Sequence, residues 1–194
     1  MQKSLLFLGA LTIFMMGYWV PEDRHVPVEG AKPYDWNPAS FWYVGGQNAQ
    51  KGINIFARKG TSVEASTSGL VVYRDTDANG DKSVYVLGSK WRVHHYANMG
   101  EVDVIPGTWV RTGEKIGTVG TPKGTKASSR PANLYYSIRS LPPQVSELEP
   151  AKPFWLDRVF YVDPHKFLTE YQASDTGMLK AATAATAKNE PARH

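Results

Sequence analysis

The most constraining feature of this sequence is a series of short apolar runs, separated by turn residues, between residues 52 and 140. The runs GLVVYRD (69–75) and SVYVLG (83–88) flank a polar turn, which is the signature of a β-hairpin. In residues 104–120 glycines punctuate the apolar residues, a spacing typical of tight corners in a small closed β structure. With 42% hydrophobic residues the chain can bury a core. We therefore expect an all-β fold built on a small antiparallel sheet with a barrel-like closure.

The first twenty residues differ from the rest of the chain in hydropathy. Residues 4–20 carry no charge, and as a helix they would extend about 26 Å, the short end of what a bilayer core requires. We expect residues 1–20 to be an uncleaved signal anchor, that is, a transmembrane helix; a cleaved signal and a buried soluble helix are the alternatives. Lys3 precedes the apolar run, and Glu22 and Asp23 follow it, which predicts a cytoplasmic N-terminus.

This topology places the rest of the chain outside the cytoplasm. In a Gram-negative bacterium the protein would be a periplasmic domain anchored in the inner membrane. If the signal is cleaved, the protein is instead secreted to the periplasm.

Composition divides the chain beyond residue 20 into three parts. Residues 21–44 are rich in proline, tryptophan and tyrosine without a clear period, so we interpret them as a linker and an irregular flap. Residues 45–172 carry the strand pattern and form the main domain. Residues 173–194 are low in bulky apolar side chains, and we expect a disordered tail there.

Two segments near the end of the main domain depart from the strand pattern. Residues 141–159 indicate an irregular insertion, held down by Phe154 and Trp155. Residues 161–172 predict a short C-terminal helix with Asp163 as its N-cap.

Composition also excludes several classes of site. The chain has no cysteine, which excludes disulfides, thiolate zinc sites and a cysteine nucleophile. The net charge is only +4 and the basic residues are scattered, so we expect no nucleic-acid binding. The loop DTDANGDK (75–82) has carboxylates at calcium-loop spacing, but Val86 stands where a glutamate ligand is required. A solvated hairpin turn is therefore the favoured interpretation.

Four blocks of the strand pattern stand in one order and carry a family resemblance. They are KGINIFARKGTSVEASTSGLVVY (51–73), WRVHHYANM (91–99), VRTGEKIGTVG (110–120) and NLYYSI (133–138). Together they resemble the lysostaphin-like, or LytM-type, peptidases, which are zinc enzymes that cut peptide crosslinks in bacterial peptidoglycan. The resemblance covers roughly residues 45–141 and resumes at 160–168, so residues 45–172 are identified as a LytM-type domain.

The resemblance implies five site positions, and all five depart from the family pattern. In the family, a histidine and an aspartate in the first block and the second histidine of a His-x-His pair bind zinc. Those positions here are Gln50, Asn54 and Tyr135. Two further histidines of the family assist catalysis, and their positions here are Asn98 and Asn133. The chain is thus a degenerate member that lacks the metal ligands.

The chemistry of the replacements matters. A catalytic zinc ion is held by imidazole, thiolate or carboxylate ligands. The amide oxygens of Gln50 and Asn54 are poor donors, and the Tyr135 phenol, with an ordinary pKa of about 10, would have to lose a proton. Asn98 and Asn133 can donate hydrogen bonds but cannot shuttle protons at neutral pH. We expect no zinc cofactor and no catalytic residue.

The remaining histidines do not replace the missing ligands. His94 and His95 are adjacent on a predicted strand, so their side chains point to opposite faces and cannot chelate one ion together. We expect each to have a core or surface role. His165 is expected to be exposed, and His25 to lie outside the domain.

The sequence therefore predicts a catalytically inactive homologue of LytM-type peptidoglycan peptidases. The five replaced positions, Gln50, Asn54, Asn98, Asn133 and Tyr135, would line one groove, and binding in that groove without cutting is one of two interpretations of the replacements. Family members that lack the ligands regulate cell-wall hydrolases, so the resemblance implies peptidoglycan or a cell-wall hydrolase as the partner, with residues 1–20 as the membrane contact. The alternative is an active zinc metalloendopeptidase with a rearranged site, which cuts peptidoglycan crosslinks. Drift after loss of activity and selection for binding both stay open.

Overall fold

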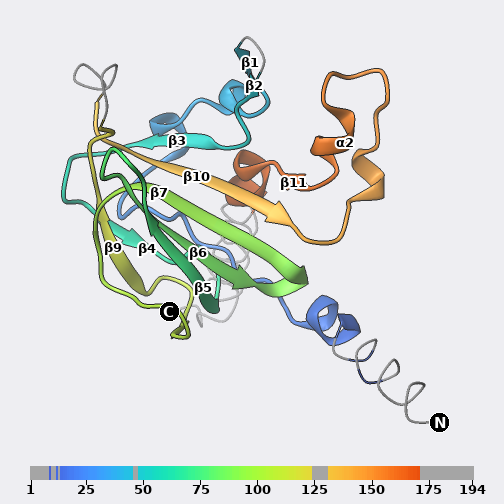
Figure 1. Cartoon of the computed structure of the whole chain (residues 1–194), viewed down its shortest axis with the longest axis horizontal. Helices are drawn as coiled ribbons and strands as arrows, with labels where there is room; N and C mark the ends of the chain where they lie inside the picture. Colours follow the sequence, from blue (N-terminus) through green and yellow to red (C-terminus); the bar gives the residue numbers. More distant parts are fainter. Residues whose placement is uncertain (1–8, 10–11, 13, 46–47, 124–130, 171–194) are drawn as a thin grey trace, which may run out of the picture.

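The structure, a computed structural model, describes residues 9, 12, 14–45, 48–123 and 131–170. Its main element is a nine-stranded sheet in which every strand pair is antiparallel (Figure 1). The strands are β3 (Ile53–Phe56), β4 (Ser62–Glu64), β5 (Gly69–Thr76), β6 (Lys82–Gly88), β7 (Arg92–Val102), β8 (Trp109–Val110), β9 (Lys115–Val119), β10 (Asn133–Ser140) and β11 (Tyr161–Val162). A separate hairpin joins β1 (Val44–Gly45) and β2 (Asn48–Ala49). The predicted antiparallel β architecture is confirmed.

The order of strands places β10 and β7 in the middle of the sheet. The main path runs β11-β10-β7-β6-β5-β8, while β3 pairs with β10, and β9 joins β4 to β7. The hairpin of β5 and β6 turns through the acidic loop, where the Asp77 side chain accepts hydrogen bonds from the backbone of Asn79 and Asp81. The loop that resembled a calcium loop is therefore a hairpin turn, as predicted.

Helical structure is sparse. The short helices are η1 (Pro33–Asp35), η2 (Pro38–Ser40), η3 (Ser89–Trp91), η4 (Val145–Glu147) and α2 (Trp155–Arg158). Residues 14–19 and 164–170 are also helical. No helix among the described residues is both long enough and apolar enough to span a bilayer. The anchor over residues 1–20 therefore stays a prediction, and the predicted tail, 173–194, lies outside the described residues.

The core lies on one face of the sheet because the strands alternate. On β10 the side chains of Leu134, Tyr136 and Ile138 are fully buried, and Tyr96 on β7 packs against Tyr136 with ring centroids 5.4 Å apart. Side chains at the intervening positions point to the opposite face. The apolar alternation that predicted these strands is thus the pattern that separates a core face from the face discussed below.

A small polar cluster is enclosed in this core. The hydroxyl of Ser66 contacts the phenol oxygens of Tyr96 and Tyr136, each at 2.7 Å, and the Nδ1 atom of His94 lies 2.8 Å from the Tyr136 oxygen. His94 is completely buried, and its Nε2 atom has no partner among the described residues. Burial, aided by the positive charge of Arg92, lowers the pKa of His94 to about 3. His94 is therefore a neutral core residue.

The segment interpreted as linker and flap, 21–44, packs on the sheet. Val28 bridges to Val63 and Trp36 to Ile55, and both residues of the segment are buried. His25, expected outside the domain, instead places its Nε2 atom 2.6 Å from a Glu64 oxygen. Apolar side chains without a regular period can still cover the end of a sheet, which is why the sequence pattern did not reveal this packing.

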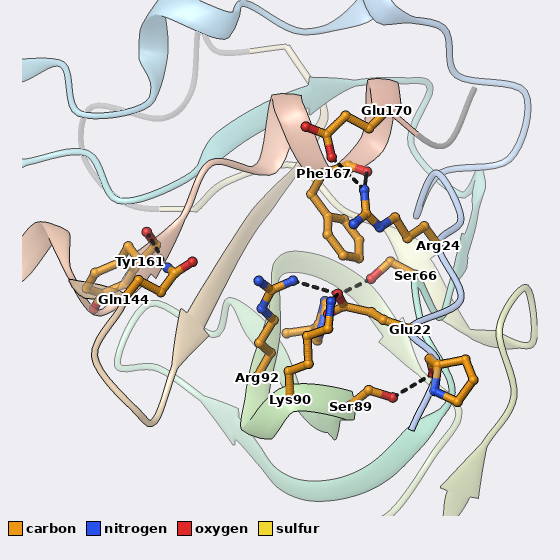
Figure 2. A network of polar contacts seen from close by, with 12 residues as sticks. Glu22, Arg24, Ser66, Ser89, Lys90, Arg92, Gln144, Tyr161, Phe167 and Glu170 are labelled. Atoms are coloured by element: carbon orange, nitrogen blue, oxygen red, sulfur yellow. Dashed lines mark hydrogen bonds and ion pairs between the residues drawn. The ribbon is translucent and has the colours of Figure 1, made fainter. Parts of the chain in front are cut away.

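The start of that segment is held by a buried ion pair. The Glu22 side chain is 2% exposed, and one of its oxygens lies 2.6 Å from Arg92 and 3.3 Å from Lys90 (Figure 2). The Ser89 hydroxyl donates to the carbonyl of Pro21 at 3.0 Å. Residues just after the predicted anchor are therefore fixed to η3 and the start of β7.

The predicted attachment of the insertion was wrong for Phe154, which is 39% exposed, whereas Trp155, the other predicted residue, is half-buried. Asp157 pairs with Lys51 at 2.7 Å, and the Arg158 guanidinium lies over the ring of Trp42 at 4.9 Å. Charged and cation–π contacts thus connect α2 to the β1–β2 hairpin region.

The last described helix, residues 164–170, begins at the predicted N-cap. The Asp163 carboxylate accepts the backbone N–H of His165 at 2.9 Å. The expectation that His165 is exposed was wrong: its ring is half-buried, and the Trp36 indole donates to its Nδ1 atom at 3.1 Å. The helix is therefore anchored to the N-terminal segment.

Candidate functional site

The five positions singled out from the sequence come from neighbouring strands and from the residues next to them. Asn54 on β3 pairs directly with Tyr135 on β10, so the two side chains share a face. On its other side Tyr135 pairs with Ala97 of β7, which precedes Asn98. Asn133 stands two residues before Tyr135 and therefore lies on the same face.

The two positions of the catalytic histidines are joined by a hydrogen bond. The Asn98 amide nitrogen donates to the Asn133 side-chain oxygen at 2.9 Å, and the Asn133 nitrogen donates to the carbonyl of Pro131 at 2.9 Å. Asn133 is 4% exposed, so its amide needs these partners. Asn98 adopts a left-handed backbone conformation, with φ of 60°, which asparagine tolerates better than most residues.

Gln50 is placed by the β1–β2 hairpin. Its backbone N–H donates to the carbonyl of Tyr43 at 2.9 Å, and its carbonyl accepts from Trp42 at 2.7 Å. Its side chain turns back to the carbonyl of Gly52 at 3.1 Å. A Cβ at Gly52 would clash with the backbone oxygen of Tyr136 and would lie 2.9 Å from the Tyr135 ring. Only glycine therefore lets the chain after Gln50 pass this close to β10. Gln50 thus lies near Tyr135 without bonding to it.

A row of rings crosses the sheet on the Tyr135 side. Tyr85 on β6 stacks on His95 of β7 with centroids 4.2 Å apart, and His95 meets Tyr135 edge-on at 5.9 Å. Tyr73 on β5 extends the row, 5.6 Å from Tyr85. Burial raises the pKa values of Tyr85 and Tyr135, and burial lowers the pKa of His95 to about 4. Tyr85, His95 and Tyr135 are therefore uncharged at neutral pH.

His95 and Tyr85 were not among the predicted site residues. The sequence did contain one signal, because alternation puts His95 on the face opposite His94. Alternation alone could not identify Tyr135 and Tyr85 as the neighbours of His95. These contacts depend on the pairing of β7 with β10 and with β6, which the sequence does not reveal.

The family's zinc ion can be tested against the donors that are present. Gln50 and Asn54 offer neutral amides, and the Tyr135 phenol is further from losing its proton than an exposed tyrosine. One imidazole, His95, lies beside Tyr135. A catalytic zinc site needs three imidazole, thiolate or carboxylate ligands, and nowhere in the described part of the chain do three histidine or acidic side chains gather to hold a metal ion. The residues at this site do not fit zinc.

Hydrogen bonds join only some of the five replaced positions. Asn98 and Asn133 bond to each other, and Tyr135 fills space between β3 and β7. Within the described residues, no side-chain hydrogen bond joins Gln50 or Asn54 to the other three positions. The site is therefore an amide pair next to an aromatic row rather than a closed ring of amides.

Comparison with known proteins agrees with this fold. The sequence profile described as Peptidase family M23 matches residues 48–149. No curated protein matches the chain.

Among solved structures, a chain in the crystal structure of the SpoIIIAH and SpoIIQ complex superposes with a TM-score of 0.54, at 19% identity over 75% of this chain and 100% of that chain. The antimicrobial peptidase lysostaphin from Staphylococcus simulans gives a TM-score of 0.47, at 20% identity, covering 62% of this chain and 44% of that one. A putative peptidase M23 from Pseudomonas aeruginosa gives 0.45, at 21% identity, with coverages of 59% and 44%. This chain thus spans less than half the length of the last two proteins.

Proposed function

The chain belongs to peptidase family M23, and from this premise we propose that it is a catalytically inactive member that serves as a binding or regulatory module of the bacterial cell envelope. The observation that carries the proposal is the hydrogen-bonded pair of Asn98 and Asn133. Two amides that bond to each other stand at the two positions where the family resemblance expects proton-shuttling histidines. A side-chain amide does not ionise near neutral pH, so neither residue serves as a general acid or base.

The metal positions support the same conclusion by a separate route. Gln50, Asn54 and Tyr135 offer neutral oxygen atoms, and burial makes the Tyr135 phenol harder to ionise. Without an anionic or imidazole ligand set, no zinc ion would be held to activate water. Loss of the ligands and loss of the proton carriers thus coincide in one site.

A binding role is supported by the aromatic row beside this site. Tyr73 is 54% exposed, and the row continues through Tyr85 and His95 to Tyr135. Rigid aromatic side chains are enriched where proteins bind partners, because they bury much area at low entropic cost. We propose that this row and the amide pair contact peptidoglycan or a cell-wall hydrolase. The structural neighbour in the SpoIIIAH and SpoIIQ complex is itself part of a protein assembly.

The location is proposed from the sequence. Residues 1–20 would anchor the domain at the outer face of the inner membrane, because Lys3 precedes the apolar run and Glu22 and Asp23 follow it. Cell fractionation followed by N-terminal sequencing tests this proposal. A soluble mature chain that begins near Ala31 would show that the signal is cleaved and that the protein is secreted to the periplasm.

Metal content and cleavage test the loss of catalysis. Protein purified without added zinc is expected to contain no stoichiometric metal and to leave the crosslinks of isolated sacculi intact. One equivalent of zinc with chelator-sensitive cleavage would instead establish the alternative, an active endopeptidase with a rearranged site.

Restoring the family residues makes this test sharper. A variant with Gln50→His, Asn54→Asp and Tyr135→His is expected to bind zinc, because the backbone of the site is that of the family. The matched control, Asn98→His with Asn133→His, adds two imidazoles at the catalytic positions only and is expected to bind zinc much more weakly. Equal zinc binding by both variants would contradict the assignment of ligand positions.

The regulatory role has its own assay. Dye-labelled sacculi are digested by a cell-envelope extract, with and without the purified protein. We expect the protein to change the rate of dye release, and the Tyr85→Ala variant to lose most of this effect. The control Tyr34→Ala removes an exposed tyrosine of η1 away from the row. If the effect is kept in Tyr85→Ala but lost in Tyr34→Ala, the binding surface lies outside the aromatic row.

A further inference from the structure

A polar cavity lies away from the amide pair of Asn98 and Asn133. It has a volume of about 370 Å³ and is formed by the N-terminal segment, the start of β7, the insertion and the helix 164–170. Figure 2 shows part of its wall, with Arg24 and Arg92 on one side and Gln144 and Tyr161 on the other. A cavity of this size is in the range of small-molecule sites.

The lining of this cavity carries an excess of positive charge. Its cationic side chains are five, and its carboxylates are three, so the wall carries an excess of two positive charges. Phe41, Trp42 and Tyr161 supply the aromatic part of the wall. The cations are Arg24, Arg92, Lys152, Arg158 and Lys166, and the carboxylates are Glu149, Asp163 and Glu170.

Three of the cations are engaged within the protein. Arg24 pairs with Glu170 at 2.9 Å, and Lys152 pairs with Glu149 at 2.5 Å. Arg92 pairs with Glu22, which lies outside the lining and also pairs with Lys90, so that counting both leaves the excess at two positive charges. These pairs hold the wall in place but reduce its attraction for an anion.

Two cations, Arg158 and Lys166, form no ion pair with a carboxylate among the described residues, although the charges of both act on the nearby Glu149 carboxylate. The Arg158 guanidinium stacks on the buried ring of Trp42, and its hydrogen bond runs to the carbonyl of Pro153 at 3.4 Å. Lys166 sits in the first turn of the last helix, where the Asp163 carboxylate accepts backbone N–H groups instead of contacting its ammonium. The contact with Trp42 and the hydrogen bond to Pro153 hold the Arg158 guanidinium in the wall, which lowers the entropic cost of binding an anion there.

We propose that this cavity binds the phosphate group of a small phosphorylated ligand. A phosphate monoester carries a charge of about −1.5 to −2 at neutral pH, which matches the excess positive charge of the wall. Planar guanidinium groups bind phosphate in a bidentate manner, and a lysine adds a point charge. A carboxylate carries only one charge and fewer acceptor oxygens, so it fits the cavity less well.

Two kinds of molecule carry a suitable phosphate group, a lipid and a soluble sugar phosphate, and one experiment distinguishes between them. Arg24 stands four residues after the predicted anchor, so a lipid headgroup and a soluble sugar phosphate would both reach the cavity. Calorimetric titration of the full chain uses inorganic phosphate, glucose 6-phosphate, glucuronate and glucose as soluble ligands. Vesicles of phosphatidylcholine with and without phosphatidic acid form the second arm. Binding in either arm supports the site, and the arm that binds more tightly identifies the source.

Matched variants assign the binding to the cavity. Arg158→Gln with Lys166→Gln should weaken glucose 6-phosphate binding by about tenfold or more, because each removes a charge-assisted hydrogen bond. The control Arg58→Gln with Lys59→Gln removes two exposed cations from the β3–β4 turn and should change nothing. Arg158→Lys keeps the charge but not the planar fork, and it provides a milder variant with an expected intermediate loss.

Several outcomes would overturn the proposal. It fails if no phosphorylated ligand or vesicle binds, if glucuronate binds as tightly as glucose 6-phosphate, or if both double variants weaken binding equally. The proposal does not rest on the regulatory function, because neither the amide pair nor Tyr135 lines this cavity.

Discussion

The buried His94 should make the stability of this protein fall in mild acid. Its ordinary pKa of 6.5 is lowered to about 3 in the folded chain. Between these two values the unfolded state binds a proton that the folded state refuses, so acid favours unfolding. Each pH unit in this window is worth about 1.4 kcal/mol, so the contribution of His94 to the free energy of unfolding should drop by about 3 kcal/mol between about pH 8 and pH 4.5. Below the folded pKa the loss should level off.

Urea unfolding followed by tryptophan fluorescence measures this loss. The comparison is with His94→Asn, which keeps a polar atom near Tyr136 and Ser66 but cannot titrate. The variant is expected to be less stable at pH 8 but to lose about 3 kcal/mol less than the unmodified protein on acidification. His95, whose pKa is also lowered, is present in both proteins and cancels in the difference. Identical losses in the two proteins, or a His94 ring that titrates near 6.5 by NMR, would refute the reasoning.

Three further substitutions test other parts of the structure by the same unfolding assay. Glu22→Gln should cost about 3 kcal/mol, because it leaves the Arg92 charge without its buried partner, whereas Glu101→Gln, which removes the charge of an exposed ion pair, should cost much less; equal costs would contradict the burial of the ion pair. Asn98→Ala should be about 1 kcal/mol less stable than Asn98→Gly, since both lose the amide bond but only glycine accepts the left-handed backbone freely; the reverse order would exclude that conformation. Gly117→Ala should cost about 1–3 kcal/mol, because its methyl group would press on the Glu101 carbonyl, and an unchanged midpoint would disprove this close approach.

The sequence predicted the parts of the fold that depend on local pattern. The hairpin of β5 and β6 follows from two alternating runs around a polar turn, and the cap of the last helix follows from Asp163. The packing of Trp36 against Ile55 and His165 did not follow, because it joins residues far apart in the chain and no period marks it. Long-range packing of irregular segments leaves no local signal.

The candidate site shows the same division. The pair of Asn98 and Asn133 could be anticipated, because the family blocks assign both residues to one site. The left-handed backbone at Asn98 has a weak signal in the preference of asparagine for that region. The basic cavity had no signal in the sequence. Its cations lie in four separate segments, and only the folded chain brings them together; they include Arg24, Arg92, Arg158 and Lys166.

The arrangement of β10 explains how the chain could lose its ligands and still fold. Leu134, Tyr136 and Ile138 bury themselves in the core, while Asn133 and Tyr135 point to the other face. Substitution of Asn133 and Tyr135 changes the chemistry of the site. It leaves the apolar core, and therefore most of the folding free energy, unaltered. The hydrogen bonds of Asn133 to Asn98 and Pro131 satisfy the one buried amide that this exchange introduced on β10. Catalysis and folding are thus separable on a single strand, and this separation is the physical reason that restoring ligands at positions 50, 54 and 135 should not require a new fold.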